Sequence, residues 1–339
     1  MKIALFAYSR QGCRTAHAVM TLFSQDDIRV HTMERFEEKG FDRIRRPTKP
    51  FYGELFSWAD VLVFIGSCGI AVREIAPHVR DKRTDPAVVC IDESGRFVIP
   101  LLSGHIGGAN EMAVKIANHL NATPVITTAT DINNRFSVDT WATRNNFVID
   151  NINHAKTISA AILERDIPLS CDFAITTDLP SGVVTGDSGD LGICISYRKK
   201  TPFDQTLRLI PKVLHVGLGC RRGISAPAIH ETINTVLAQN ELDSKAVKCV
   251  ASIDLKANEE GLLKYCEGNG LSPVFYTFAE LLKVPGEFTP SAFVQTVTGV
   301  DNVCERAALM GADQLIVKKT VVNGVTVAVA AENLEVRFG

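Results

Sequence analysis

The sequence predicts an α/β protein with an N-terminal parallel-sheet α/β domain, a small middle α/β segment and a C-terminal α/β domain. Three observations predict this class. Short apolar runs rich in β-branched residues alternate with helical periodicity from the N-terminus, the same alternation starts again near Lys212, and Arg198–Pro202 between them is polar and ends in proline. Because 339 residues exceed one ordinary domain, we expect domains at 1–144, 145–210 and 211–339.

In the first domain the apolar runs are short enough to be buried strands. The expected strands are Lys2–Tyr8, Val61–Ile65, Ala87–Ile91, Phe97–Leu102 and Pro124–Thr128. Helical spacing of apolar residues predicts helices at Thr15–Phe23 and Ala109–Leu120. Strands that alternate with helices indicate a largely parallel sheet covered on both faces.

The middle segment has fewer signals, and the last domain repeats the first pattern. The middle segment should hold a helix at Ala155–Arg165, strands at Phe173–Thr177 and Leu191–Tyr197, and a long surface loop at Asp178–Asp190. The last domain should hold strands at Lys212–Gly217 and Val247–Ile253, and helices at Ala226–Ala238 and Glu259–Glu267, with Val303–Met310 continuing the alternation. Asn323-Gly324 predicts a hairpin between Leu315–Lys319 and Val325–Ala330, because both turn positions require positive φ.

Composition excludes several classes of function. A net charge of −2 argues against non-specific binding of nucleic acid, which requires a basic surface. No apolar run is long enough to span a membrane, and Met1–Tyr8 is too short for a signal peptide. The nine cysteines are odd in number and form no C-x-x-C pair. We therefore expect a cytoplasmic protein in a reducing compartment, with no metal site of its own.

Two glycine loops of the first domain carry the strongest local signals. Ser103–Glu111 runs from a strand into a helix, where glycines let a ligand approach and helix N–H groups favour an anion. His105 in this loop is placed to act as an acid, a base or a carboxylate ligand, although a tight turn with a backbone-bonded histidine explains it equally well. The second loop, Gly66–Arg73, also follows a strand, and Thr127–Asp131 should lie at the same sheet edge as that loop.

A third glycine loop, Gly217–Gly223, precedes a helix of the last domain. It fails the dinucleotide-binding pattern, since Arg222 occupies the third glycine position and Asp254 lies 35 residues beyond Gly219 rather than the usual distance of about 20. Arg221 and Arg222 at a helix start suit carboxylate groups instead. Generic motifs thus predict an α/β enzyme with a small anionic ligand.

Several segments together resemble the cobalt-precorrin-5A hydrolase family. In the first domain these are Gly69–Pro77, Asp85–Val89, Asp92–Val98, Leu101–Asn110 and Pro124–Asp131. In the last domain they are Gly217–Gly223, Ser252–Lys256, Gly299–Leu309 and Thr326–Ala330. They occur in the family's order and span roughly residues 50–140 and 212–331. The resemblance implies hydrolysis of the ring-A δ-lactone of cobalt-precorrin-5A, with release of acetaldehyde to give cobalt-precorrin-5B in cobalamin biosynthesis.

The resemblance also implies that no cofactor is needed, because cobalt arrives with the substrate. Lactone opening requires an activated water, stabilisation of an oxyanion and a proton for the leaving oxygen. We expect His105 and Glu305 as acid/base groups, and Lys256 or Arg221 near the oxyanion or a substrate carboxylate. For Glu305 a helix-start carboxylate is an equal alternative, and for Lys256 a solvated loop lysine.

The remaining candidates are substrate-binding residues of the three glycine loops and their neighbours. They are Gly66, Ser67, Gly69, Arg73, Ser103, Gly104, Gly107, Gly108, Asn110, Thr128, Asp131, Gly219, Arg221 and Arg222. The expected partner is the small-molecule substrate, with neither nucleic acid nor membrane, and with a homodimer or transient contacts to neighbouring pathway enzymes. Two other functions stay open: a non-catalytic tetrapyrrole carrier, and a nucleotide-dependent enzyme disfavoured by the broken glycine pattern.

Overall fold

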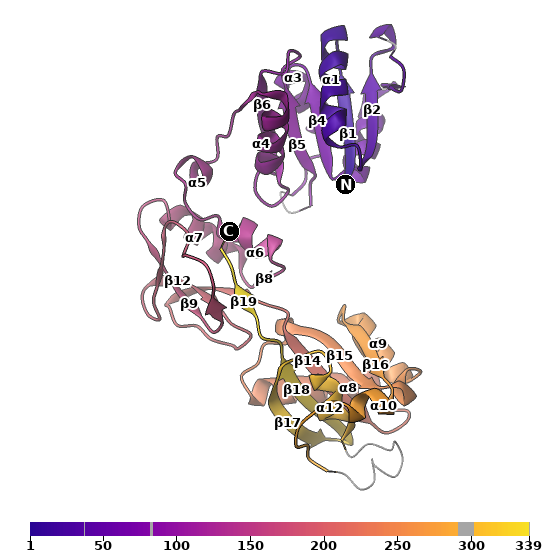
Figure 1. The fold of residues 1–339 in the computed structure, drawn as a ribbon, viewed down its shortest axis with the longest axis vertical. Coiled ribbons are helices and arrows are strands. Elements are labelled where there is room, and N and C mark those ends of the chain that lie inside the picture. Colours follow the sequence, from indigo (N-terminus) through magenta and orange to yellow (C-terminus); the bar gives the residue numbers. More distant parts are fainter. Residues whose placement is uncertain (37, 82–83, 291–301, 339) are drawn as a thin grey trace. The chain divides into compact units, whose positions relative to one another are not determined.

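The chain folds into two compact units, Met1–Thr140 and Trp141–Gly339 (Figure 1). The computed structural model describes residues 1–36, 38–81, 84–290 and 302–338, apart from the side chain of Asp131. Parallel strands and helices alternate in both units, so the predicted α/β class is confirmed. The predicted division of residues 145–339 into a middle segment and a C-terminal domain stays a prediction. In the described part of the chain, no helix combines the length and apolarity needed to cross a bilayer.

The first unit contains one seven-stranded sheet in the order β3-β2-β1-β4-β5-β6-β7. Its strands are β1 (Lys2–Ala7), β2 (Asp27–Thr32), β3 (Asp42–Arg43), β4 (Val61–Ile65), β5 (Ala87–Ile91), β6 (Phe97–Leu102) and β7 (Thr123–Pro124). Its helices are α1 (Arg10–Leu22), α2 (Thr48–Trp58), α3 (Cys68–Ile75), α4 (Ala109–Leu120), α5 (Ala129–Ile132) and α6 (Val138–Arg144), the last of which runs into the second unit.

Both faces of this sheet are buried. Side chains of successive strand residues point to opposite faces, and helices cover each face. Ile3 and Leu5 of β1 pack with α1 and α4 on one face. Ala4 and Phe6 pack with α2 and α3 on the other. Helix α1 begins at Arg10, earlier than the predicted Thr15, because the Ser9 side chain accepts a hydrogen bond from the Gly12 N–H and caps the helix.

The expectation that the loop Gly66–Arg73 and the segment Thr127–Asp131 lie at the same edge of the sheet is wrong. Strand β6 pairs antiparallel with β5, so Leu102 at its carboxyl end lies beside Val88 near the start of β5. The carboxyl ends of β4 and β6 therefore lie at opposite sheet edges. The predicted strand Pro124–Thr128 is also shorter, since β7 ends at Pro124, and only the Val125 N–H extends the pairing, to the Val98 carbonyl.

The second unit contains two five-stranded sheets and a two-stranded one. The first has the order β11-β9-β12-β13-β8, the second β16-β15-β14-β18-β17, and the small one pairs β10 with β19. The strands are β8 (Val148–Ile149), β9 (Ile167–Cys171), β10 (Ala174–Ile175), β11 (Val183–Thr185), β12 (Leu191–Ile195), β13 (Gln205–Ile210), β14 (Leu214–Cys220), β15 (Val247–Ile253), β16 (Ser272–Tyr276), β17 (Gln314–Val322), β18 (Val325–Ala331) and β19 (Glu335–Val336). The helices are α7 (Ile152–Ala161), α8 (Ala226–Gln239), α9 (Glu260–Gly268), α10 (Phe278–Leu282) and α12 (Val303–Leu309), with 3₁₀ turns at Ser244–Ala246 and Asp254–Lys256.

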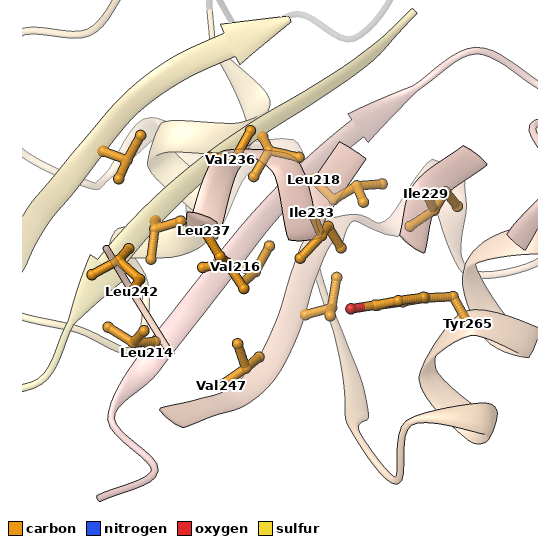
Figure 2. Close-up of a cluster of buried hydrophobic side chains, with 14 of the residues drawn as sticks. Leu214, Val216, Leu218, Ile229, Ile233, Val236, Leu237, Leu242, Val247 and Tyr265 are labelled. Carbon is orange, nitrogen blue, oxygen red and sulfur yellow. The ribbon is translucent and has the colours of Figure 1, made fainter. Parts of the chain in front are cut away.

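One hydrophobic core of the second unit lies between α8 and β14. Figure 2 shows Ile233 and Val236 of α8 with Val216 and Leu218 of β14, all fully buried. On the other sheet face α12 lies against β14 so closely that a Cβ on Gly217 would be 1.8 Å from the Cys304 carbonyl oxygen. Glycine is required at this crossing.

The predicted hairpin is confirmed, and the predicted middle loop is partly wrong. Strands β17 and β18 pair antiparallel, and Asn323 and Gly324 between them have φ values of 51° and 78°. The segment Asp178–Asp190 is not all loop, because Val183–Thr185 forms β11 beside β9. Its apolar pair Val183-Val184 is the local signal for that strand.

Candidate functional site

The loop Ser103–Glu111, here called the His105 loop, is a tight connection between β6 and α4. Ser103 has a left-handed φ of 56°, and Gly108 has a φ of 80°. A Cβ on Gly107 would lie 2.4 Å from the Ser103 Cβ, and one on Gly104 would lie 2.7 Å from Asn110 Oδ1. These three glycines are therefore fixed by the fold of the loop itself.

The helix start in this loop has fewer donors for a ligand than the sequence predicts. The Ala109 N–H donates to the Ser103 carbonyl at 3.1 Å, and the Asn110 N–H donates to the Gly104 carbonyl at 3.0 Å. Glu111 adds a carboxylate to the first turn of α4. Two of the N–H groups that the sequence offers to an anion are therefore already bonded within the loop, and an acid lies beside them.

The His105 loop contacts the segment that follows β7. His105 Nε2 and Thr130 Oγ1 are 3.1 Å apart, and Asn110 Nδ2 donates to Thr128 Oγ1 at 2.8 Å. His105 is partly buried, whereas Thr130 is buried. The fold thus brings the predicted residues His105 and Asn110 into contact with the segment that contains Thr128 and Thr130.

The second glycine loop lies at the opposite sheet edge and not with the His105 loop, which corrects the predicted grouping with Thr127–Asp131. Ser67 caps α3 by accepting a hydrogen bond from the Gly69 N–H at 3.3 Å. Gly66, with a φ of 156°, lies against the Tyr8 ring. Arg73 folds back over the helix start, since a Cβ on Gly69 would be 3.7 Å from its guanidinium.

Two residues at this edge were missed from sequence. Ser9, between β1 and α1, donates a hydrogen bond from Oγ to Glu93 Oε2 at 2.6 Å. Strands β1 and β4 are neighbours, and the chain leaves them in opposite directions across the sheet, so this edge is the position where open α/β sheets bind ligands. A serine directly after a strand and before a helical pattern was the available signal.

In the second unit Lys256 is held by a carboxylate. Lys256 Nζ lies 3.1 Å from Glu259 Oε2, and its side chain is 18% exposed. Glu259 Oε1 also accepts a hydrogen bond from the Gly223 N–H at 2.7 Å. The alternative of a solvated loop lysine is therefore wrong, and Glu259, which the sequence did not single out, fixes both Lys256 and the adjoining glycine loop.

The arginines of that glycine loop are accessible. Arg221 and Arg222 are exposed, and the Arg221 side chain lies near Gly324 of the hairpin turn. Gly219 is fixed by packing, because a Cβ there would lie 2.4 Å from Thr326 Oγ1. The loop presents two guanidinium groups to solvent, while its backbone is held by Glu259 and Thr326.

Glu305 lies in the interior of the second unit, with 1% of its surface exposed. Its carboxylate accepts hydrogen bonds from the Thr289 N–H and Oγ1 at 2.9 Å each and from the Lys319 N–H at 2.7 Å. The Glu305 N–H donates to the Asn302 side chain that caps α12. A carboxylate with these partners ties a loop and a strand together and cannot reach a substrate without breaking those bonds.

Two predicted groups fall outside the described residues. The Asp131 side chain is one, and Gly299–Asp301, which belong to a segment of family resemblance, are the other.

The predicted candidates fall into three places. The residues of the His105 loop lie with Thr128, and Gly66–Arg73 lie at the other edge of the same sheet. Gly219–Arg222 and Lys256 lie in the second unit, where Glu259 contacts both Gly223 and Lys256.

Comparison with known proteins gives one consistent family. Residues 51–131 match the family model "Cobalamin synthesis G N-terminal", and residues 214–330 match "Cobalamin synthesis G C-terminus". The chain is 33% identical to the cobalt-precorrin-5A hydrolase of Priestia megaterium, over 96% of this chain and 94% of that protein. It is 33% identical to the cobalt-precorrin-5A hydrolase of Salmonella typhimurium, over 96% of each. A solved cobalamin biosynthesis protein G homologue from Sulfolobus solfataricus aligns over 97% of both chains with 22% identity and a TM-score of 0.41.

Proposed function

Since this chain belongs to the cobalt-precorrin-5A hydrolase family of cobalamin biosynthesis, we propose that it hydrolyses the ring-A δ-lactone of cobalt-precorrin-5A and releases acetaldehyde, giving cobalt-precorrin-5B. The supporting observation is similarity at 33% identity along nearly the full length of two relatives that carry this name. The substrate is a cobalt-bearing tetrapyrrole, so its metal arrives with it.

The reaction divides into two steps with different demands. Water adds to the lactone carbonyl, the acyl carbon–oxygen bond breaks, and a carboxylate and an alcohol form. A base then takes the alcohol proton, the adjacent carbon–carbon bond breaks, its electron pair enters the conjugated macrocycle, and acetaldehyde leaves. Each step requires a group that moves a proton, and such a group typically contributes about 10²–10⁴-fold.

We assign the proton-moving role to His105. It is a partly buried imidazole in a loop whose backbone is held by tight glycine packing, and the Thr130 hydroxyl 3.1 Å from Nε2 orients the ring. Ser103 has a left-handed backbone conformation, which is rare for serine and is typical of functional loops. We do not assign this role to Glu305, because three donors hold its buried carboxylate.

Substrate carboxylates are the natural ligands of the exposed Arg221 and Arg222 guanidinium groups. Lys256 pairs with Glu259, so these two side chains together add no net positive charge for a substrate carboxylate. We therefore assign Arg221 and Arg222 to binding the acetate and propionate groups of the macrocycle, and Glu259 to positioning their loop.

The test is turnover by the purified full-length chain under anaerobic conditions, with acetaldehyde trapped as it forms. We expect acetaldehyde in proportion to the cobalt-precorrin-5A consumed. A protein that binds the macrocycle and releases no acetaldehyde would be a carrier, the alternative from sequence, and the proposal would be rejected.

A further inference from the structure

The first unit contains a polar hollow that is separate from the loops discussed so far. Its volume is about 520 Å³, and its polar lining comprises Arg29, His31, Asp42, Arg43, Arg45 and Glu54. These residues come from β2, β3, the chain that leads into α2, and α2 itself. In the sheet order β2 and β3 lie at the far side of β1 from β6 and β7, which adjoin the His105 loop.

His31 is the unusual group of this hollow. It is 5% exposed, and neither ring nitrogen has a hydrogen-bond partner among the residues that the structure describes. Its ring stacks on Phe6, with centroids 5.6 Å apart, and meets the Phe51 ring edge-on at 5.1 Å. Buried polar atoms are nearly always bonded in folded proteins, so an imidazole with two unsatisfied nitrogens points to a ligand.

The charge state of His31 determines which hydrogen bonds its ring can form. Burial lowers the pKa of His31 to about 4, with Arg29 and Arg45 acting in the same direction and Asp42 and Glu54 in the opposite one. The ring is therefore neutral near pH 7, with one N–H donor and one acceptor nitrogen. It can donate a hydrogen bond to an oxygen of a ligand.

The guanidinium groups around His31 are held in place by other contacts. Arg29 lies over the Trp58 ring, 3.9 Å from its centroid, which fixes its plane by a contact to the aromatic face. Arg45 pairs with Glu54 at 2.7 Å. The lining combines three guanidinium groups with two carboxylates, and Arg43 pairs with Glu34 at 2.9 Å.

We propose that this hollow binds a small carboxylate-bearing organic anion, whose oxygens pair with the Arg29 and Arg45 guanidinium groups and accept a hydrogen bond from His31. Such a carboxylate gives the buried imidazole a partner. Arginine forks match the geometry of a carboxylate. The volume lies within the range of small-molecule sites, about 300–1,000 Å³.

The carboxylate has two chemical sources, a free small acid or an acetate or propionate arm of a tetrapyrrole. Both present the same group to the hollow. The site stands independently of the proposed hydrolysis, because it rests on contacts of the first unit alone.

The experiment follows the His31 ring by NMR in full-length protein with ¹³C-labelled histidine, its signal being assigned with a His31→Gln variant. Propionate is added as the free acid probe, and uroporphyrin as the tetrapyrrole carboxylate probe. We expect a saturable shift of the His31 signal with at least one of them. A response to uroporphyrin alone identifies the arm of a macrocycle, and a response to propionate identifies a free acid.

An Arg45→Met variant should weaken this binding by about tenfold, the loss expected for one charge-assisted pair. The fold should tolerate it, because 64% of the Arg45 side chain is exposed. The matched control is Arg14→Met, at an exposed arginine of α1 whose bonds go to Gln11. A His31 signal that responds to neither probe, or equal binding by the Arg45→Met and wild-type proteins, would overturn the site.

Discussion

The His105 loop and the Arg221 loop (Gly219–Gly223) have the same local form, a glycine-rich turn from a strand into a helix, and yet their ionisable groups have different surroundings. In the first unit His105 is partly buried beside a hydroxyl. In the second unit Glu259 and Lys256 are paired with each other, and Glu305 is enclosed by three donors. Residue type and position in the turn do not predict these surroundings, because the partners of each side chain depend on how the rest of its unit packs around it.

The largest effect should come from replacing His105. We expect His105→Gln to lower kcat by about 100-fold or more, because glutamine can still bond Thr130 but cannot carry a proton at neutral pH. KM and thermal stability should stay close to those of the wild-type protein. The measurement is steady-state acetaldehyde release, with His17→Gln, an exposed histidine of the same unit, as control. Equal turnover by wild type and His105→Gln would remove the contrast between the two loops.

Glu305→Ala tests whether the buried carboxylate stabilises the fold and takes no part in the reaction. Losing an acceptor for three donors in the interior should destabilise the protein by about 3–5 kcal/mol. Urea unfolding of the second unit measures this, and activity per folded molecule should be retained at low temperature. A stable Glu305→Ala protein without turnover would show instead that this carboxylate takes part in the chemistry.

His31 should make the stability of the first unit depend on pH. Its pKa is lowered by burial from 6.5 to about 4, so the unfolded chain binds a proton between these values and the folded chain does not. Stability from this residue is present above pH 6.5 and is lost as the pH falls toward 4, by about 3 kcal/mol in total. Urea unfolding as a function of pH should show a smaller acid-side loss for His31→Gln. Parallel curves for the two proteins would contradict the assignment.

The smallest effect should come from Glu259→Gln. The amide oxygen can still accept the Gly223 N–H, while the ion pair with Lys256 is lost. We expect a loss of about 1 kcal/mol in stability and a modest rise in KM, with kcat unchanged. Thermal unfolding and substrate titration provide the check. A fall in kcat that matches that of His105→Gln would place the reaction in the second unit.

Local sequence signals predicted many elements with their bounds. Val61–Ile65, Ala87–Ile91, Ala109–Leu120 and Val247–Ile253 lie where the pattern placed them. In β4 and β5 a continuous apolar run is buried, in β15 every residue except Lys248 is buried, and in the helix apolar residues repeat at helical spacing. The Asn323-Gly324 turn followed from its dipeptide alone.

Strand direction and side-chain partners could not be predicted in this way. Nothing in Phe97–Leu102 indicates that this strand runs antiparallel to its neighbour, because the same apolar pattern suits both directions. This direction places the loop Gly66–Arg73 and the His105 loop at opposite edges of the sheet. The burial of Glu305 depends on donors 14 and 16 residues away in the chain. Such contacts are set by tertiary packing, which local periodicity does not encode.

Hydrolysis requires that water opens the lactone at its carbonyl. The direct measurement is the mass of the product formed from cobalt-precorrin-5A by the wild-type protein in water enriched in ¹⁸O. We predict one heavy oxygen atom per product molecule, located in the newly formed carboxylate. A product with only ordinary oxygen, formed at the same rate, would contradict hydrolysis.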